Sequence, residues 1–300
     1  MSTLAPRVVV VSRPSELTEL LGRHGTRAAA AYFLRERGRS LDEVDARHEA
    51  LQAALTAVGG AIPADWRRGH VSRADLPRFL FAPEDVIIAV GQDGLVANVA
   101  KYLSGQPVIG VDPEPGRNAG VLVRHQPGSI APLLRAAVAG RAGVQQRTMV
   151  AATLDDGQRL LGLNEIYFGH PTHQSSRYTV RVPASGQERH SSSGVIVSTG
   201  TGATGWTHSI SRQRADAPDL PGPDEAALCW FVREAWPSPA TGVRLTSGRI
   251  GADQKLELLS EAEAQVVFAD GVESDHLVLA FGQRLEVSVA PRQLHLVLGA

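Results

Sequence analysis

The sequence contains very little cysteine. Cys229 is the one cysteine among 300 residues, so the chain can form neither an internal disulfide nor a metal site built from several thiolates. It lies in an apolar run, Leu228-Cys229-Trp230-Phe231. We therefore expect Cys229 to be buried and chemically inert.

The sequence also lacks a long apolar run and an excess of either charge. No stretch approaches 18 consecutive apolar residues, and the N-terminal residues do not resemble a secretory leader. With 30 basic and 31 acidic residues, the formal net charge is −1, which gives no electrostatic basis for binding nucleic acid or an anionic membrane. We expect a soluble, cytoplasmic protein.

The apolar content of 43% is typical of a globular protein, and a length of 300 residues suggests about two domains. In the first part, short β-branched runs alternate with helical patterns. Strands are predicted at 8–11, 85–90 and 107–111, and helices at 16–37, 40–58, 95–103 and 129–138. Ser40 and Glu43 form a capping box that begins the second of these helices. This alternation predicts an open parallel α/β domain over residues 1–140.

The pattern changes after residue 140, where closely spaced strands replace the alternation. The predicted strands cover 148–154, 159–168, 177–182, 194–198, 227–233, 243–245, 255–259, 265–269, 277–281, 284–289 and 294–298. We therefore expect a β-rich domain over residues 141–300. The predicted fold class is an N-terminal α/β domain followed by a β-rich domain.

The turn after the strand at 85–90 is the first candidate site. It reads Gly91-Gln92-Asp93-Gly94 and leads into a helix that is expected to begin at Leu95. Ligands of open α/β sheets bind where such strands end, and the N-terminus of a helix offers free N–H groups to an anion. The Asp93 carboxylate can accept a proton or hold a hydroxyl; alternatively, it caps the helix.

Three further patches lie in the second half. Asn164 and Glu165 interrupt an apolar strand and need polar partners if they are buried. A β run ends in the glycine- and hydroxyl-rich loop 198–206, which suits close approach of a ligand. Asp270-Gly271 is interpreted as a plain hairpin turn.

The remaining motifs give weaker evidence of function. Gly200, Gly202 and Gly205 form a literal G-x-G-x-x-G, but they lie in the β-rich half, without the βαβ unit and downstream acid of a dinucleotide fold. A dinucleotide oxidoreductase that uses these glycines remains an alternative function. No Walker A sequence is present. His170 and His173 are neighbours without an evident third ligand, so we expect no metal site there.

Taken together, the patches resemble those of the NAD kinase family. That family has a GGDG turn in an α/β domain, then an Asn-Glu pair and a Ser-Thr-Pro-Thr-Gly-Ser-Thr-Ala-Tyr-like loop in a β domain. The corresponding stretches here are GQDG at 91–94, Asn164-Glu165, and the loop 198–206, which continues to Ser209. Gly110 to Pro113 and Asn118 to Gly120 also resemble a loop of the family. Each motif is weak by itself, and the four together in this order are moderately specific.

The resemblance implies transfer of a phosphoryl group from ATP, or polyphosphate, to the 2′-hydroxyl of NAD. Asp93 would act as the general base or orient that hydroxyl, and Gly91 and Gly94 would let the backbone approach phosphates. Asn164 and Glu165 would hold the hydroxyls of the other ribose. The loop would contact the nucleotide through Thr199, Thr201, Thr204, Gly205, Trp206 and Ser209, the last four around adenine. Mg²⁺ would arrive with the nucleotide, and family members are usually homodimers or homotetramers.

The chain departs from the family at several positions. Gln92 replaces a glycine where backbone is expected to meet a phosphate, and Leu95 replaces a threonine. These departures leave two alternatives open: a related kinase acting on a sugar, nucleoside or lipid hydroxyl, and a non-catalytic module that binds NAD or another nucleotide.

Overall fold

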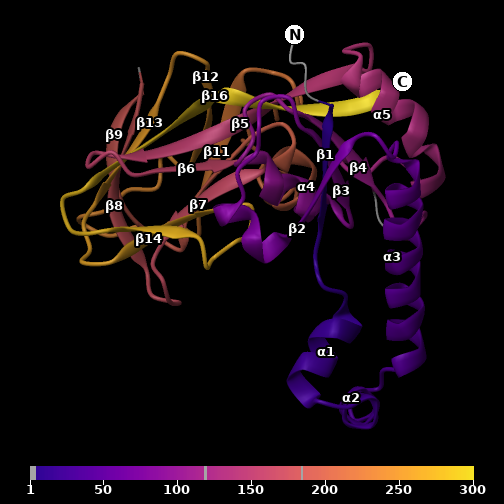
Figure 1. The fold of residues 1–300 in the computed structure, drawn as a ribbon. Helices are drawn as coiled ribbons and strands as arrows, with labels where there is room; N and C mark the ends of the chain where they lie inside the picture. Colours follow the sequence, from indigo (N-terminus) through magenta and orange to yellow (C-terminus); the bar gives the residue numbers. More distant parts are fainter. Residues whose placement is uncertain (1–4, 118–119, 184) are drawn as a thin grey trace. The chain divides into compact units, whose positions relative to one another are not determined.

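A computed structural model describes residues 5–117, 120–183 and 185–300 (Figure 1). The chain divides into two compact units, which are described separately. Unit 1 comprises residues 1–145 and 295–300, and unit 2 comprises residues 146–294. Asn118 and Ala119, which belong to the predicted family-like loop, lie outside the described residues.

Unit 1 contains a parallel sheet in the order β2-β1-β3-β4, followed by the end of the last strand, β16. Its strands are β1 (Arg7–Ser12), β2 (Arg67–Ser72), β3 (Val86–Val90), β4 (Pro107–Val111) and the last residues of β16 (Arg284–Gly299). All five residues of β3 are buried, as expected for a central parallel strand. The strands predicted at 8–11, 85–90 and 107–111 are confirmed.

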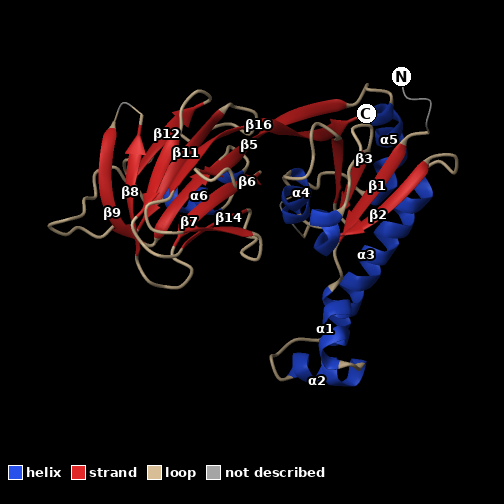
Figure 2. Cartoon of the chain, turned by 60° about the vertical axis from the view of Figure 1, so that its left-hand side comes forward, coloured by secondary structure: helices blue, strands red, loops and turns tan. Residues whose placement is uncertain are grey.

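Helices connect and cover these strands. They are α1 (Glu16–His24), α2 (Arg27–Arg35), α3 (Leu41–Ala61), α4 (Asp93–Ala100) and α5 (Ile130–Val138), with 3₁₀ turns η1 (Arg73–Arg78) and η2 (Pro127–Ser129). Apolar side chains of α3 and α5 pack against β1, β3 and β4. Helices α1 and α2 extend beyond the strands and form a small core of their own with the start of α3 (Figures 1 and 2). The predicted helix 16–37 is two helices, because Gly25 ends α1 with a positive φ of 75°.

The predicted N-cap of the long helix is present, but its bond goes to Asp42 and not to Glu43 of the predicted capping box. Ser40 is the N-cap of α3, and its hydroxyl accepts a hydrogen bond from the backbone N–H of Asp42 at 3.1 Å. We expect Ser40→Ala to lower the free energy of unfolding by about 1 kcal/mol, because this N–H loses its partner. Urea denaturation measures the change. Ser72→Ala is the matched control, because Ser72 precedes η1 without a side-chain cap and should cost less; equal losses would contradict the prediction.

Unit 2 is built from two facing sheets. Strands such as β8 and β14 alternate buried and more exposed residues, whereas β10 is buried at every residue. One sheet contains β8 (Ser176–Val182), β9 (Gly186–Ser192), β13 (Leu256–Ser260) and the first part of β16, together with β5 (Gly143–Leu154) and β6 (Arg159–Gly162). The other is antiparallel, in the order β12-β11-β10-β7-β14-β15. Its strands are β7 (Glu165–Gly169), β10 (Gly194–Ser198), β11 (Ala227–Arg233), β12 (Ser247–Gly251), β14 (Gln265–Ala269) and β15 (His276–Leu279). The short elements η3 (Gly202–Thr204) and α6 (Trp206–Ser211) follow β10.

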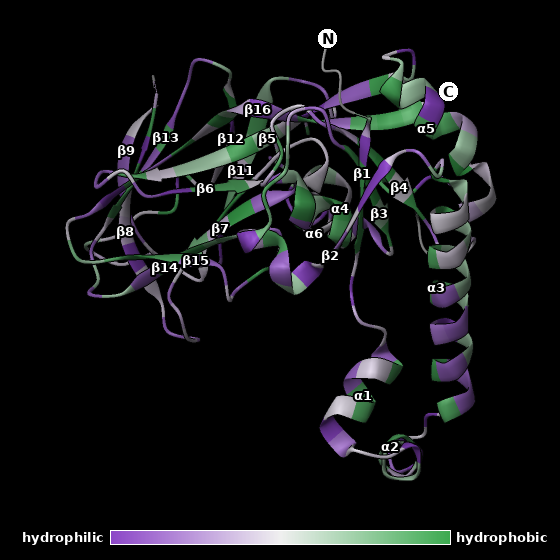
Figure 3. Ribbon diagram, viewed as in Figure 1, coloured by the Kyte–Doolittle hydropathy of each residue, from purple (hydrophilic) through white to green (hydrophobic). Residues whose placement is uncertain are grey.

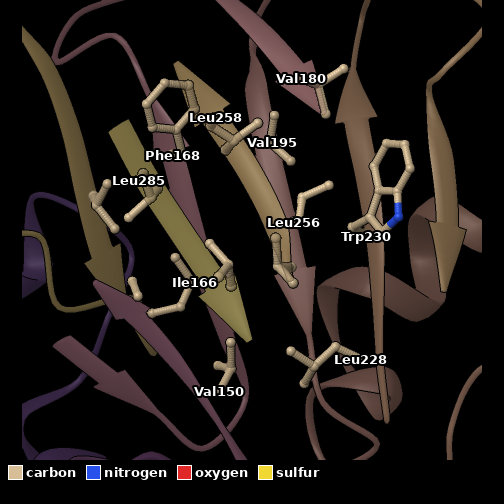
Figure 4. Packing of buried hydrophobic residues seen from close by; sticks show 14 of the residues in the cluster. Val150, Ile166, Phe168, Val180, Val195, Leu228, Trp230, Leu256, Leu258 and Leu285 are labelled. Atoms are coloured by element: carbon tan, nitrogen blue, oxygen red, sulfur yellow. The ribbon is translucent and has the colours of Figure 1, made fainter. Parts of the chain in front are cut away.

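A single apolar core lies between the two sheets of unit 2. Figure 4 shows Val180, Leu256, Leu258 and Leu285 of one sheet among Phe168, Val195, Leu228 and Trp230 of the other. The strands of this unit carry both hydrophobic and hydrophilic segments (Figure 3). Cys229 alternates with the core residues Leu228 and Trp230 along β11 and is not part of this core, but it is fully buried. Burial raises the pKa of its thiol to about 12, which agrees with the expected inert state.

Several predicted boundaries are wrong for identifiable reasons. The segment 243–245 is not a strand, because the Glu188 carboxylate accepts the backbone N–H groups of Arg244 and Leu245. The stretch 159–168 is two strands, β6 and β7, separated by a bend at Leu163 and Asn164. The stretches 284–289 and 294–298 are one continuous strand, β16. Strands β2, β9 and β12 were not predicted. Among the described residues, no helix is both long and apolar enough to cross a membrane.

Candidate functional site

The predicted GQDG turn lies at the carboxyl end of β3, where the parallel sheet of unit 1 ends. Helix α4 begins at Asp93, two residues earlier than the sequence predicts. Gln92 is its N-cap residue, and the backbone N–H of Leu95 donates to the Gln92 carbonyl at 2.9 Å. The Gln92 side chain does not cap the helix. A Cβ built on Gly94 has no atom within 4 Å, so this glycine leaves open space at the turn.

The Asp93 carboxylate points to another loop rather than to its own helix. One oxygen, Oδ1, accepts the backbone N–H groups of Leu122 and Val123 at 2.8 and 2.9 Å, and Oδ2 accepts that of Val121 at 3.0 Å. The alternative that Asp93 is merely a helix cap is therefore wrong. A carboxylate has about four acceptor positions, so three bonds leave one position on Oδ2 for a further donor.

A cavity of about 320 Å³ adjoins this turn within unit 1. Its lining comes from the segments that follow β1, β3 and β4 and from α1 and α3, and includes Arg13, Glu16, Arg47, Gln92, Glu114 and Arg117. Arg13 donates to the Gln92 side-chain carbonyl at 3.1 Å. The carboxyl ends of parallel strands are the usual ligand site of such sheets, and arginines suit phosphate groups. The cavity therefore has the position of a ligand site. Two of its arginines form ion pairs with its glutamates, Arg47 with Glu16 at 3.4 Å and Arg117 with Glu114 at 3.3 Å.

The Asn164-Glu165 pair belongs to unit 2, at the bend between β6 and β7. The Asp270 carboxylate accepts the backbone N–H groups of Leu163 and Asn164 at 3.0 and 2.6 Å, and the Asp270 N–H donates to the Glu165 carbonyl at 3.1 Å. Asp270 has a positive φ of 53°, which is uncommon for a residue other than glycine. The plain turn predicted at Asp270-Gly271 is a turn that also fixes this bend.

Glu165 lies in a setting that disfavours its charge. Burial, and secondarily the negative charge of Asp270, raise its pKa from 4.5 to about 7. Within the described residues, its carboxylate has no hydrogen-bond or ion-pair partner. A carboxyl group of this kind is available to a ligand and changes its charge near neutral pH.

The glycine- and hydroxyl-rich loop packs directly against this bend. The Thr199 hydroxyl donates to the Leu163 carbonyl at 2.6 Å and accepts the N–H groups of Thr201 and Gly202 at 3.1 and 3.3 Å. The buried Arg147 donates to the Thr201 hydroxyl at 3.4 Å. Both threonines are buried, so they act on a ligand by shaping the loop. Thr204, Gly205, Trp206 and Ser209 are exposed on the other side of the loop.

The first two glycines of the G-x-G-x-x-G pattern have a packing role. A Cβ on Gly200 would lie 1.9 Å from the Gly222 carbonyl oxygen, and one on Gly202 would lie 2.2 Å from that of Asn164. No side chain fits either place. Loss of NAD binding in Gly202→Ala would therefore not identify a dehydrogenase, because the substitution displaces the loop whatever the ligand.

We expect Gly202→Ala to lower the free energy of unfolding by about 2 kcal/mol, because the new methyl group overlaps the Asn164 carbonyl and the Ser198 hydroxyl. Thermal or urea unfolding measures this loss. Gly222→Ala is the control in the same unit, because the nearest atom to its Cβ would lie at an ordinary 3.6 Å. If both variants were as stable as the wild type, the close packing of this loop would be wrong.

The predicted site residues thus fall into two sets, one in each unit. Asp93, Gly91 and Gly94 lie in unit 1, and the Asn164-Glu165 bend and the loop lie together in unit 2. Asp270 was predicted only as part of a plain turn. Its bonds to the Asn164-Glu165 bend were not predicted, because its partners are backbone N–H groups of a distant segment. Within the described ranges, no group of three or more His, Cys, Asp or Glu side chains could hold a metal ion.

Comparisons with known proteins agree with the resemblance of the motifs. The chain is 25% identical to a NAD kinase of Chlorobaculum tepidum over 127 residues, which are 42% of this chain and 44% of that protein. It is 26% identical to a NAD kinase of Clostridium tetani over 199 residues, which are 64% of this chain and 68% of that protein. The chain thus spans less than half of the first relative in that alignment. No protein-family model matches the chain.

Proposed function

We propose that the protein is a NAD kinase-like phosphotransferase, which moves a phosphoryl group from ATP, or polyphosphate, to the 2′-hydroxyl of NAD to give NADP. The names of the two relatives support this activity. So do the mixed α/β sheet and the separate antiparallel sheet, which are consistent with the two-domain plan that the resemblance implies.

The observation that carries the proposal is the state of the Asp93 carboxylate. Three backbone N–H groups hold it rigidly and leave one acceptor position on Oδ2. In the proposed reaction, the 2′-hydroxyl donates to that position. Asp93 orients the hydroxyl oxygen toward the γ-phosphorus atom of ATP and receives its proton as the new P–O bond forms, while the bond from that phosphorus to the bridging oxygen breaks and ADP leaves. Phosphoryl transfer requires mainly positioning and charge neutralisation, so one fixed acceptor is sufficient.

The other residues have binding roles in this proposal. The arginines of the unit 1 cavity neutralise phosphate charge, and Gly91 and Gly94 keep the turn open to it. Asn164 and Glu165 hold the hydroxyls of a ribose. Thr199 and Thr201 shape the loop, while Thr204, Gly205, Trp206 and Ser209 present its exposed side to the nucleotide. Mg²⁺ bound to ATP would neutralise part of the phosphate charge.

A coupled assay tests the proposal directly. The purified chain is incubated with NAD, ATP and Mg²⁺, and NADP is read with an NADP-specific dehydrogenase. We expect NADP to accumulate with enzyme concentration. The assay is repeated with a sugar, a nucleoside or a lipid alcohol in place of NAD. This tests the alternative that the protein is a related kinase with a different acceptor. If NADP does not form while one of these acceptors is phosphorylated, the acceptor proposed here is wrong.

One observation favours the second candidate, a non-catalytic nucleotide-binding module. The Gln92 side chain engages Arg13 at the cavity, in a turn where the family has a glycine. A double variant, Gln92→Gly with Leu95→Thr, separates the candidates, because an impaired kinase should gain turnover while a binding module should not. Calorimetry with NAD identifies the module as a chain that binds NAD but forms no product.

A further inference from the structure

Residues 234–246 of unit 2, which we call the strap, connect β11 to β12 and lie along the edge strand β9. The Trp236 N–H donates to the Ser191 carbonyl at 2.8 Å. Further along the strap, the Gly242 N–H donates to the Arg189 carbonyl at 2.9 Å. Unpaired backbone groups of an edge strand would otherwise face solvent or another chain. The strap therefore covers the edge of this sheet.

The carboxylate of Glu188, on β9, holds the strap in place. Oε2 accepts the backbone N–H groups of Arg244 and Leu245, both at 2.8 Å, and Oε1 accepts the Arg244 Nε–H at 3.3 Å. Gly242 leaves room for this carboxylate, because a Cβ there would lie 2.1 Å from Oε1. Glu188 is buried, so these bonds replace the water that its charge would otherwise require.

His190 lies beside this carboxylate and is completely buried. It is two residues further along β9, on the same face, and its Nε2 lies 3.1 Å from Glu188 Oε2. Its ring stacks on that of Tyr178 in β8, with centroids 5.7 Å apart and planes inclined by 11°. Within the described residues, neither ring nitrogen makes a well-aligned hydrogen bond. The strap bonds to both chain neighbours of this histidine, Arg189 and Ser191, so His190 lies in the covered stretch.

The titratable and charged groups around His190 come from three segments. They are Glu188 on its own strand, Tyr178 on β8, and Arg244 on the strap. In the described part of the chain, Glu188 is the one acid that forms an ion pair with His190. A protonated His190 would therefore compete with the strap for Glu188. It would also carry an Nδ1–H without an acceptor, which is unfavourable in a buried place.

We propose that the strap is an acid-sensitive cover, which detaches from β9 when His190 takes up a proton, while both sheets of unit 2 stay folded. The base of the strap remains attached, because the Val232 N–H donates to the Thr246 carbonyl at 2.7 Å. The Arg214 guanidinium donates to the carbonyls of the same two residues. Detachment exposes the edge of β9 and the buried pair behind it.

The proton equilibria of both buried groups favour detachment in acid. Burial lowers the pKa of His190 from 6.5, and the Glu188 charge only partly offsets this. Burial would raise the pKa of Glu188, but the hydrogen bonds from Leu245 and Arg244 outweigh it and hold this pKa below 4.5. Each group binds a proton more readily when the strap is open. The closed form is therefore fully stable above pH 6.5 and loses stability below it through His190, with a further loss below pH 4.5 through Glu188.

Amide hydrogen exchange of the full chain at about pH 7.5 and about pH 5.5, read by mass spectrometry and corrected for the intrinsic rates, measures detachment. We expect the protection of residues 236–245 to fall by up to about tenfold for each pH unit below 6.5, because one proton is taken up. Strand β13, in the same sheet, should keep its protection. His190→Phe keeps a ring against Tyr178 but cannot titrate, so it should lose this pH dependence. His173→Phe is the matched control, because His173 is exposed in the same unit, and it should respond as the wild type does.

Equal corrected protection of the strap at both pH values would overturn the inference, as would an unchanged pH dependence in His190→Phe. An equal loss of protection in β13 would also overturn it, because unit 2 would then unfold as a whole. If His190→Phe does not fold, His190→Gln gives the same comparison, and the comparison of strap and β13 in the wild type needs no variant. The measurement needs no substrate, so its outcome is independent of the proposed function.

Discussion

Asp93→Asn is expected to reduce the rate of NADP formation by about 10²–10⁴-fold, the usual contribution of a positioned general base. The carboxylate is the group that accepts the hydroxyl proton in the proposed reaction, and an amide cannot take it. Coupled NADP assays of the wild type and the variant measure the ratio of rates. NAD affinity, measured by calorimetry, should fall much less, because only one hydrogen bond to the substrate changes.

Asp93→Asn is also expected to lower the stability of the fold, and the experiment must distinguish this loss from the loss of catalysis. An asparagine in place of Asp93 turns its amide N–H₂ toward at least one of the three backbone N–H groups that the carboxylate now accepts. A buried donor left without a partner costs about 1–3 kcal/mol. We therefore expect Asp93→Asn to be less stable in urea than the wild type, but still folded.

Asp112→Asn is the matched control. Asp112 follows the neighbouring strand β4, is buried, and accepts the backbone N–H of Glu114 at 2.9 Å. Its role is structural, so its variant should lose stability while keeping the rate of NADP formation within a few-fold of the wild type. If the two variants lost activity equally, Asp93 would be a structural residue rather than a base.

Glu165→Gln is expected to abolish a pH dependence of stability worth about 3 kcal/mol, because burial and Asp270 raise the pKa of Glu165 from 4.5 to about 7. A carboxyl group whose pKa is higher in the folded than in the unfolded state stabilises the fold while it is protonated in both. That stability is present below pH 4.5 and is lost as the pH rises to about 7. The wild type should therefore become less stable over this window relative to the glutamine variant.

Urea unfolding of both proteins at a series of pH values from about 4 to about 8 measures the difference, since all other titrating groups are shared. Tryptophan fluorescence reports mainly on unit 2, which contains Trp206, Trp230 and Trp236. Asp270→Asn should shift the window to lower pH by removing the neighbouring charge. Parallel stability curves for the wild type and Glu165→Gln would show that the Glu165 pKa is ordinary.

The sequence predicted the elements whose side chains carry a strong pattern. The apolar run of β3 and the capping Ser40 identified their elements correctly. The unpredicted strands β2, β9 and β12 read RRGHVS, GQERHSS and SGRIG, and they contain few apolar residues because their pairing, rather than their burial, defines them. Residues 295–300 belong to unit 1, where the end of β16 pairs with β4. Because β4 is distant in the sequence, no local pattern predicts this pairing.

The candidate site was predictable in its residue types but not in its geometry. The motifs singled out Asp93 and Glu165 as candidates, because Asp93 lies in the glycine turn after a buried strand and Glu165 interrupts an apolar stretch. They did not indicate that the Asp93 carboxylate binds the loop 121–123, or that Asp270 holds the bend before Glu165. In both cases a carboxylate accepts backbone N–H groups from a segment that is distant in the sequence. Almost every residue type supplies such a group, so the sequence gives no signal for these contacts.

Transfer of label from γ-³²P-ATP to NAD measures the proposed reaction itself, with 2′-deoxy-NAD as the matched acceptor. We expect labelled NADP from NAD and no labelled product from the 2′-deoxy compound, because the hydroxyl held by Asp93 is absent from it. Labelling of both acceptors would place the phosphate on another hydroxyl. Labelling of neither, with NAD bound normally, would contradict phosphoryl transfer to NAD by this protein.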